Sequence, residues 1–384
     1  MKRQITNKHL TWAEIDLGAI KHNIRAIKSL ASPQTQVMAV VKANAYGHGA
    51  LPVAKAALQA GAAWLAVNRV NEGIALREAG ISARILVLGY CPPFQAADAL
   101  RHRLTPTVTT LETARALADL AADLSRPFSV HLKIDTGMGR FGLLPDEVLP
   151  FARALQKMPS LHLEGIFSHF AVADEEDPAF TQRQLQTFNG VLNALQKAGV
   201  DIPLKHLANS AASMRFPDAR FNLLRLGIAM YGLRPSADVN WPVSLRPAMS
   251  LKTRAARVRT LPAGASVGYG RTWRAPAATP VALAPVGYGD GYPRLCSSRG
   301  AMLLRGQRAP VAGRVSMDQT SLDISGIEDV AQDDEIVVFG KQGEAEITAD
   351  EVAVWAKTIN YEIVTGVTAR VPRVYLAGDD ISVR

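Results

Sequence analysis

The sequence predicts an α/β protein with an N-terminal (β/α)8 TIM-type barrel followed by a mostly β domain. Over residues 12–245, eight short apolar runs alternate with amphipathic helical windows, which is typical of a parallel sheet with helical crossovers. Over residues 246–384, strand-like runs are separated by Gly, Pro and Asp turns, which indicates a β-rich domain. Residues 1–11 carry no motif, and the second domain can include them.

The predicted barrel strands are short apolar runs at 37–41, 64–67, 84–88, 105–108, 129–134, 164–168, 204–207 and 223–229. The window "FTQRQLQTFNGVLNALQKAG" between the sixth and seventh has apolar residues three or four positions apart, at Leu185, Phe188, Leu192 and Leu195. One helix face can therefore pack on the sheet. Eight repeats favour a closed barrel over an open doubly wound sheet, and no glycine-rich dinucleotide turn follows the first strand.

The second domain is predicted to contain one helix among its strands. "ITADEVAVWAKTI" has helical periodicity, with Thr348 or Asp350 near its N-terminal cap. "LKTRAARVRT" at 251–260 alternates basic and apolar residues, which is typical of a half-exposed strand.

Composition excludes several classes of protein. The net charge of +9 comes from scattered basic residues, whereas a nucleic-acid interface needs a dense basic cluster, so an anionic small ligand is favoured over nucleic acid. No segment is long and apolar enough to span a membrane or to act as a signal peptide. Cys91 and Cys296 are far apart and lack metal-ligand spacing, so we expect neither a disulfide nor a metal site, and a cytoplasmic protein.

Polar residues gather where the predicted barrel strands end. Lys42 follows the first strand in "VVKANAYGHG", Lys133 ends the fifth before "DTGMGR", and His169 ends the sixth. "HLANSAA" and "RLGIAMYG" lie at the seventh and eighth. Lys42 alone could simply extend its ammonium group to water, or it could be an imine-forming amine. Five polar segments at the face that holds barrel active sites favour a catalytic site.

Successive motifs along both domains resemble those of bacterial alanine racemases. They are "AVVKANAYGHG", "HLKIDTGMGRFG", "FSHFAVAD", "HLANSAA", "RLGIAMYG", "SVGYGRTW", "VGYGDGYPR", "GRVSMDQT" and "INYEIVTG". The resemblance runs in order from Trp12 to Tyr375. It implies dependence on pyridoxal 5′-phosphate (PLP) and a homodimer with shared active sites. One departure is Ser316, where the family often has cysteine.

The resemblance implies two catalytic bases. Lys42 would bind the cofactor aldehyde as an imine and act as one base. Tyr269 of "SVGYGRTW" would be the second base, supplied by the partner subunit; by itself it could equally be a packed aromatic in a turn. Either base needs its pKa lowered, from about 10.4 for lysine or about 10 for tyrosine.

The resemblance also places Arg225 at the pyridine nitrogen of the cofactor. Arginine keeps its proton, so it would donate a hydrogen bond, leave that nitrogen unprotonated and suppress side reactions such as transamination. The alternative is a surface ion pair, which the apolar "LLRLGIAMYG" does not favour. His206 would orient Arg225, and His169 would orient Tyr269 beside the cofactor.

The remaining implied residues would contact the phosphate and the substrate. Backbone N–H groups and hydroxyls suit a phosphate, and the cofactor contacts implied are Tyr46, Asn209, Ser210, Gly227, Ile228 and Tyr361. Arg140 and the backbone N–H of Met317 would bind the substrate carboxylate. Lys133 would carry a carbamate that holds Arg140, or else would be an ordinary salt-bridged lysine. Tyr288, with Tyr361, would narrow the entrance.

The expected activity is interconversion of L- and D-alanine, which supplies D-alanine for peptidoglycan or degrades it. Two alternatives remain: another PLP enzyme of this fold, such as a decarboxylase or a broad-specificity racemase, and a non-catalytic PLP-binding barrel. Arg225 argues against the decarboxylase, which would need an acidic group there. The lack of an export signal argues against the usually exported broad-specificity racemases, and the second domain with Tyr269 argues against the non-catalytic barrel.

Overall fold

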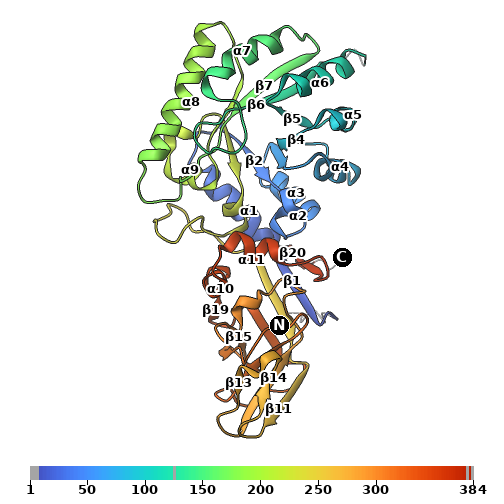
Figure 1. Ribbon diagram of the computed structural model, residues 1–384, viewed down its shortest axis with the longest axis vertical. Coiled ribbons are helices and arrows are strands. Elements are labelled where there is room, and N and C mark those ends of the chain that lie inside the picture. The colour runs from blue at the N-terminus through green and yellow to red at the C-terminus, as the bar shows by residue number, and fades with distance from the viewer. Residues whose placement is uncertain (1–7, 124–126, 378–379, 382–384) are drawn as a thin grey trace. The chain divides into compact units, whose positions relative to one another are not determined.

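The computed structural model describes residues 8–123, 127–377 and 380–381. The chain divides into two compact units (Figure 1). The barrel unit comprises residues 19–45 and 50–246, and the β unit comprises the N-terminal segment as far as Gly18, residues 46–49 and the chain from Pro247 onwards.

Eight parallel strands form the barrel unit, in the order β8-β7-β6-β5-β4-β3-β2-β9. Their bounds are β2 (Gln36–Val40), β3 (Trp64–Val67), β4 (Arg84–Tyr90), β5 (Thr105–Val108), β6 (Phe128–Lys133), β7 (Leu161–Phe167), β8 (Leu204–His206) and β9 (Leu223–Leu226). The last strand returns to the first, since β9 pairs in parallel with β2. β8 and β9 are the two ends of the ladder. Arg225 N–H of β9 donates to the carbonyl oxygen of Ala208, which follows β8 by two residues (3.1 Å). The predicted eight-stranded barrel is therefore confirmed as a nearly closed one.

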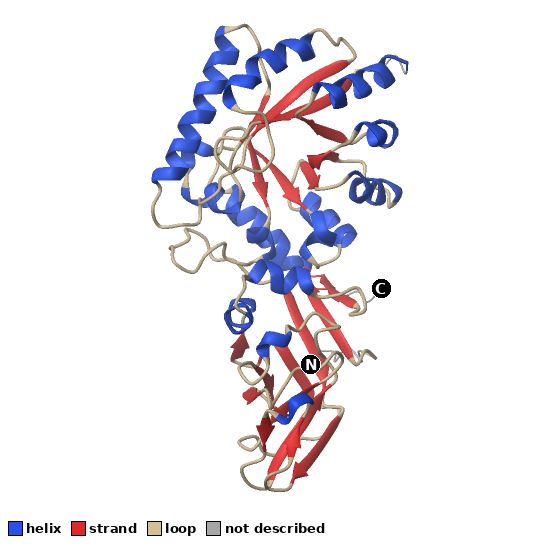
Figure 2. Cartoon of the chain, viewed as in Figure 1, coloured by secondary structure: helices blue, strands red, loops and turns tan. Residues whose placement is uncertain are grey.

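Helices connect the strands and lie outside them (Figure 2). The principal ones are α1 (Leu17–Lys28), α3 (Ala50–Gln59), α4 (Val70–Glu78), α5 (Ala96–Arg101), α6 (Leu111–Asp123), α7 (Pro145–Gln156), α8 (Ala179–Lys197) and α9 (Ser210–Arg215). In α8, Phe188 and Leu195 are buried as predicted, while Leu185 and Leu192 are half-buried at the edge of that face. All residues of β3, β5 and β9 are buried, because helices cover one side of parallel strands and the barrel interior the other.

The β unit contains one large and two small sheets. The large sheet joins β16-β15-β18-β10-β1-β20-β21, with β19 on β18; these strands are β1 (Thr11–Asp16), β10 (Met249–Arg254), β15 (Ala301–Leu304), β16 (Gln307–Pro310), β18 (Glu335–Gln342), β19 (Ala345–Ile347), β20 (Arg373–Ala377) and β21 (Asp380–Ile381). The small sheets are β11-β14-β17 and β12-β13, with β11 (Arg257–Leu261), β14 (Thr279–Ala284), β17 (Thr320–Asp323), β12 (Ser266–Val267) and β13 (Trp273–Arg274).

The β unit differs from the prediction at its start and in its helices. β1 pairs with β10 and β20, so residues 12–16 belong to its sheet rather than to the barrel. Among the described residues of this unit there are two α-helices instead of one, α10 (Ala349–Ala356) and α11 (Asn360–Gly366). Thr348 caps α10 by accepting a hydrogen bond from Glu351 N–H (3.1 Å). "LKTRAARVRT" spans two strands, because β10 ends at Arg254 and β11 begins at Arg257.

Candidate active site

Lys42 follows the end of β2 and begins an unusual turn. The next four residues all have positive φ angles of 51–54°: Ala43, Asn44, Ala45 and Tyr46. A left-handed conformation costs a non-glycine residue roughly 1–2 kcal/mol, so this turn persists only because its surroundings hold it. Ala43 N–H donates to Glu72 Oε1 (2.6 Å), and Asn44 Oδ1 accepts from Ala50 N–H (2.8 Å). Strain of this kind is typical of functional sites.

The amine of Lys42 makes no hydrogen bond or ion pair with any residue that the structure describes. Burial lowers its pKa, the charge of Arg140 lowers it further, and Glu72 opposes the shift. A lowered pKa increases the fraction of neutral amine, which is the nucleophilic form. Lys42 is therefore suited to react with a carbonyl group.

Arg225 lies on β9 with 3% of its surface exposed. Nη1 donates to Nδ1 (3.1 Å) and the carbonyl oxygen (2.8 Å) of His206. Nη2 donates to the carbonyl oxygens of Ser168 (2.6 Å) and Leu207 (3.0 Å) and lies 3.2 Å from Nδ1 of His169. Burial lowers the pKa of Arg225 to about 9, so the group remains a cation at neutral pH. Among the described residues, nothing accepts from Nε–H, which leaves this donor for a ligand.

His206 thus contacts Arg225 as predicted, and His169, which we placed beside Tyr269, also contacts Arg225. Burial and the charge of Arg225 hold the pKa values of both histidines well below the usual range. Both rings are neutral at physiological pH. Because a guanidinium group only donates, Nδ1 of each ring is the acceptor.

Four cations influence one another at the strand ends of the barrel unit. Burial lowers the pKa of Lys133 to about 8, helped by Arg225, Arg140 and Lys42. Within the described chain, Lys133 has no ion pair; its Nζ lies 4.9 Å from the ring centroid of Phe141. The alternative of an ordinary salt-bridged lysine is thus not observed. Arg140 is exposed, whereas Lys42 is half-buried and Lys133 and Arg225 are buried; a group of cations of this kind favours anionic ligands.

The "DTGMGR" loop wraps around the carboxylate of Asp135 and so positions Arg140. Oδ1 accepts from the N–H groups of Gly137 (2.9 Å) and Gly139 (3.0 Å), and Oδ2 accepts from Arg140 N–H (2.9 Å). Gly137 has φ +132° and Gly139 has φ +67°, so the loop needs glycine at both positions.

Two short helices begin side by side next to Ser210. Asn209 caps α9 by accepting from Ala212 N–H (3.0 Å). Ser210 Oγ accepts from the N–H groups of Gly227 (3.0 Å) and Ala229 (3.2 Å), at the start of the 3-10 helix η3 (Ile228–Tyr231). The N–H groups of Ser210 and Ile228 point out of these first turns without a partner in their own helices, which suits a phosphate. Gly227 N–H, which we expected at the phosphate, is engaged by Ser210.

The β unit carries the other candidate residues. The rings of Tyr46 and Tyr361 have centroids 6.4 Å apart, and burial raises the pKa of Tyr46 to about 12, so its hydroxyl remains a donor. Tyr269 begins the 3-10 helix η4 (Tyr269–Arg271) between β12 and β13, and 72% of its surface is exposed. Tyr288 and Met317 also expose their side chains. The segments of these two residues are hydrogen-bonded, because Gly289 N–H donates to the Met317 carbonyl oxygen (2.8 Å).

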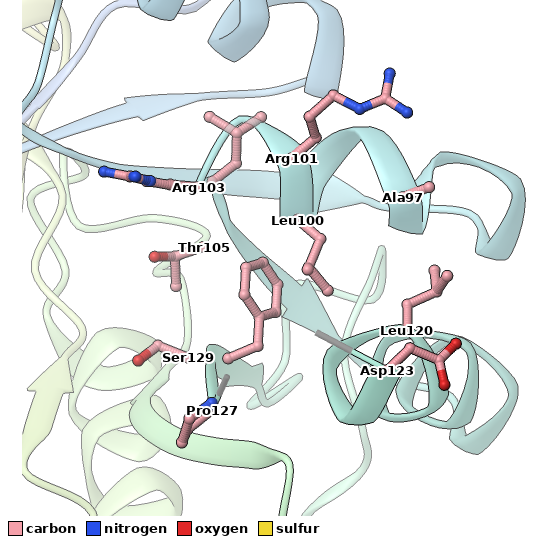
Figure 3. A pocket seen from close by; sticks show the side chains of 11 residues that line it. Ala97, Leu100, Arg101, Arg103, Thr105, Leu120, Asp123, Pro127 and Ser129 are labelled. Atoms are coloured by element: carbon pink, nitrogen blue, oxygen red, sulfur yellow. The ribbon is translucent and has the colours of Figure 1, made fainter. Parts of the chain in front are cut away.

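The barrel unit also has a hollow of about 580 Å³ near the first residues of β5 and β6 (Figure 3). Its lining includes Leu100, Thr105 and Phe128, and also Arg101 and Arg103. None of the predicted site residues lines this hollow. Barrel active sites lie at the opposite ends of the strands, where Lys42 and Lys133 are found.

The sequence did not single out Glu72, Asp135 or His131, whose Nδ1 lies 2.9 Å from His206 Nε2. Asp135 lies inside a quoted motif and was recognisable as a turn residue. His131 precedes Lys133 by two positions on β6, so both face the same side of the strand. Nothing in the sequence pairs Glu72 with Ala43, which lies 29 positions earlier in the turn that follows Lys42.

The fold and the site define a class: a (β/α)8-barrel enzyme with a lysine of lowered pKa and a cluster of cations at the strand ends. Two family models match the chain, the alanine racemase N-terminal domain over residues 15–235 and the alanine racemase C-terminal domain over residues 248–375. The chain therefore belongs to the alanine racemase family, as its motifs indicated.

Individual relatives agree with the family assignment. An alanine racemase from Desulforamulus reducens is 48% identical over 371 residues, which cover 96% of this chain and 100% of the relative. The crystal structure of alanine racemase from D-cycloserine-producing Streptomyces lavendulae has a TM-score of 0.92 at 41% identity and covers 97% of this chain and 98% of that one. The Bacillus anthracis alanine racemase with bound L-Ala-P has a TM-score of 0.92 at 39% identity and covers 98% and 97%.

Proposed function

We propose that this chain interconverts L- and D-alanine with PLP as its cofactor. The observation that carries the proposal is the Nε–H of Arg225, for which no described residue is an acceptor. Two neutral histidines hold this guanidinium group, and the strand ends of the same unit carry the amine of Lys42, whose pKa is lowered. The family assignment supports the same activity. Neither a decarboxylase nor a non-catalytic barrel is favoured by these relatives.

The residues present fit PLP. Lys42 would bind its aldehyde, Arg225 Nε–H would face its ring nitrogen, and the N–H groups of Ser210 and Ile228 with the hydroxyls of Tyr46 and Tyr361 would hold its phosphate. When bound, PLP delocalises the electron pair left after an α-proton is removed from an amino acid. Because Arg225 keeps its proton at neutral pH, below its pKa of about 9, it would donate a hydrogen bond and keep an acceptor nitrogen unprotonated. Asn209 would act indirectly, by capping the helix that begins at Ser210.

Inversion at the α-carbon requires a proton to leave one face and another to arrive at the opposite face. Lys42 Nζ would serve one face and Tyr269 Oη the other, with His169 nearby. Tyr269 is largely exposed in the single chain, which supports its donation to the site of a second subunit. The functional form would then be a homodimer.

Substrate binding would use the cation cluster. The fork of Arg140 and the backbone N–H of Met317 suit a planar carboxylate, and Tyr288 would restrict the side chain to a small one. Because Lys133 has a pKa of about 8, a fraction of it is neutral and can react with carbon dioxide. The resulting carbamate would place an anion among the cations and pair with Arg140. Cys91 and Cys296 are free and buried, which fits a cytoplasmic enzyme that supplies D-alanine for peptidoglycan or degrades it.

Exchange of α-protons in deuterated water tests the substrate assignment. PLP-loaded protein is incubated with single amino acids, and both exchange and chirality are followed. We expect alanine to exchange and racemise, and Lys42→Ala to abolish both. Lys55→Ala, on the exposed side of α3, is the matched control and should retain full activity. Exchange of lysine or arginine without exchange of alanine would overturn the proposal.

A further inference from the structure

A row of polar side chains crosses the barrel interior from Arg84 to Arg225. Arg84, whose side chain is 60% exposed, pairs with Glu164 (Nη1 to Oε1, 2.7 Å). The other carboxylate oxygen of Glu164 lies 3.7 Å from His131 Nε2. His131 Nδ1 lies 2.9 Å from His206 Nε2, and His206 Nδ1 accepts from Arg225. Arg84 lies on β4. The other residues of the row lie on four further strands: His131 on β6, Glu164 on β7, His206 on β8 and Arg225 on β9.

Donor and acceptor roles along this row follow from its last member. Because Arg225 only donates, His206 Nδ1 accepts, and the proton of the neutral His206 ring is on Nε2. That proton is donated to His131 Nδ1, so the proton of His131 is on Nε2, which faces Glu164. Burial lowers the pKa values of both histidines, although Glu164 opposes this for His131. When both rings are neutral, every other tautomer pattern places two N–H groups facing each other, so this pattern is the favoured one.

The distance from His131 Nε2 to Glu164 is too long for a hydrogen bond, and no other described residue bonds this nitrogen. The interaction is therefore one between a carboxylate and an N–H dipole in a buried site, where the low dielectric strengthens it. Reversing the His131 tautomer would place a lone pair toward Glu164 and a second proton toward His206. Both changes are unfavourable.

The packing prevents the rings from turning to another arrangement. A Cβ on Gly165 would lie 2.5 Å from Nδ1 and Cε1 of His131, so only glycine leaves room for this ring. The ring centroid of Trp64 lies 5.3 Å from that of His131. Phe167 stacks on His206 with centroids 4.7 Å apart and planes 11° apart. The strand ladder is irregular between Val130 and His131, which is where β6 accommodates the ring.

We propose that Glu164 and His131 are positioning residues for Arg225: they fix the His206 tautomer whose Nδ1 accepts from Nη1, and so aim Nε–H at the ligand. The effect on catalysis rests on the proposed function, whereas the tautomer pattern does not. Loss of the Glu164 charge removes the interaction that favours the Nε2–H tautomer of His131 at this end of the row, so Arg225 alone then selects the tautomers of both rings. A second tautomer, in which His206 Nδ1 carries the proton and Arg225 loses one of its two ring acceptors, then becomes populated.

The experiment uses Glu164→Gln, which keeps the side-chain shape and removes the charge, with the exposed Glu78→Gln of α4 as the control. Nitrogen-15 NMR of histidine side chains reads which ring nitrogen carries the proton, and the chain has eight histidines to assign. In PLP-loaded wild-type and Glu78→Gln protein, we expect protons on Nε2 of both His131 and His206. In Glu164→Gln we expect a second tautomer at both rings. A proton on Nδ1 of wild-type His206, or unchanged signals in Glu164→Gln, would overturn the inference.

The kinetic part separates positioning from general destabilisation. We expect Glu164→Gln to lower kcat roughly tenfold with little change in KM for alanine, and to raise the ratio of transamination to racemisation. Glu164→Asp, which restores the charge, should recover part of both. Arg84→Gln, at the exposed end of the row, should lower kcat and raise the transamination ratio in the same way but to a smaller extent. This variant replaces Glu164→Gln in the test if Glu164→Gln does not fold. Wild-type protein without racemase activity but with this tautomer pattern would refute only the proposed function. Active Glu164→Gln with unchanged kcat and side reaction would refute the positioning role.

Discussion

The carboxylate of Glu72 accepts a hydrogen bond from the backbone N–H of Ala43, 2.6 Å away, directly after Lys42. Its other oxygen accepts from the N–H groups of Asn68 (2.8 Å) and Arg69 (2.9 Å), at the start of α4. One side chain thus holds a left-handed turn and a helix start together. Lys42 is placed by this connection as well as by the end of β2.

Glu72→Gln is expected to loosen this turn. An amide has one acceptor oxygen, so one of the two sets of N–H groups would face an NH2 group, at a cost of about 1–3 kcal/mol. The urea midpoint should fall accordingly. Because Glu72 raises the pKa of Lys42, its neutralisation should also move the titration of Lys42 to lower pH. Labelling of the cofactor-free protein with an amine-selective reagent across pH, read by mass spectrometry, measures this shift. Glu78→Gln is the control, and an unchanged midpoint and titration would contradict the prediction.

Arg225→Lys is expected to change the outcome of turnover as well as its rate. Lysine has three donors where Arg225 makes five contacts and keeps Nε–H free. A buried ammonium group also gives up its proton more readily than a guanidinium group, so it is better able to protonate a ligand nitrogen. We expect kcat for racemisation to fall by about 100-fold and the yield of pyruvate from transamination to rise. Arg115→Lys, on the exposed side of α6, should match wild type. If Arg225→Lys racemises alanine and forms no more pyruvate than wild type, proton retention is not the role of Arg225.

The barrel was predictable from the sequence because its strands are buried on both sides and read as continuous apolar runs. The end of a parallel strand also fixes which edge of the sheet a residue occupies, so the grouping of Lys42, Lys133 and Arg225 followed from the strand assignments. "TWAEID" could not be assigned in the same way. Apolar alternation predicts a strand, but it does not say that β1 pairs with β10, some 235 positions later.

The supporting contacts were not predictable for a different reason. The His131 to His206 hydrogen bond joins residues 75 positions apart, and it requires particular tautomers, which depend on the burial of both rings. The capture of Gly227 N–H by Ser210 depends on the meeting of two short helices. Motifs identify residue types at sites, whereas such contacts arise from tertiary packing.

Lys133 is expected to bind carbon dioxide in a pH-dependent way. Its pKa of about 8 leaves roughly a tenth of it neutral at pH 7 and half neutral at pH 8, and the neutral amine is the reactive form. The carbamate should therefore increase as the pH rises through about 8 and be lost on acidification. Carbon-13 bicarbonate should give a carbamate NMR signal that Lys133→Ala lacks and that Lys157→Ala, at an exposed position directly after α7, retains. Lys133→Ala should also raise KM for alanine, because Arg140 loses its anionic partner. Lys133→Ala with the full signal would place the carbamate elsewhere.

Lys42 and Tyr269 are expected to complement each other across two chains. Lys42→Ala and Tyr269→Phe should each be nearly inactive alone, since each lacks one proton-transfer group. If the tyrosine of one chain serves the lysine of another, random exchange makes half of the dimers mixed, and one of the two sites in each mixed dimer is intact. Activity should then recover to about a quarter of wild type. Mixing Lys42→Ala with the double variant Lys42→Ala/Tyr269→Phe is the control and should recover nothing. Differently tagged chains that exchange fully, as shown by affinity capture, yet stay inactive would mean that both groups belong to one chain.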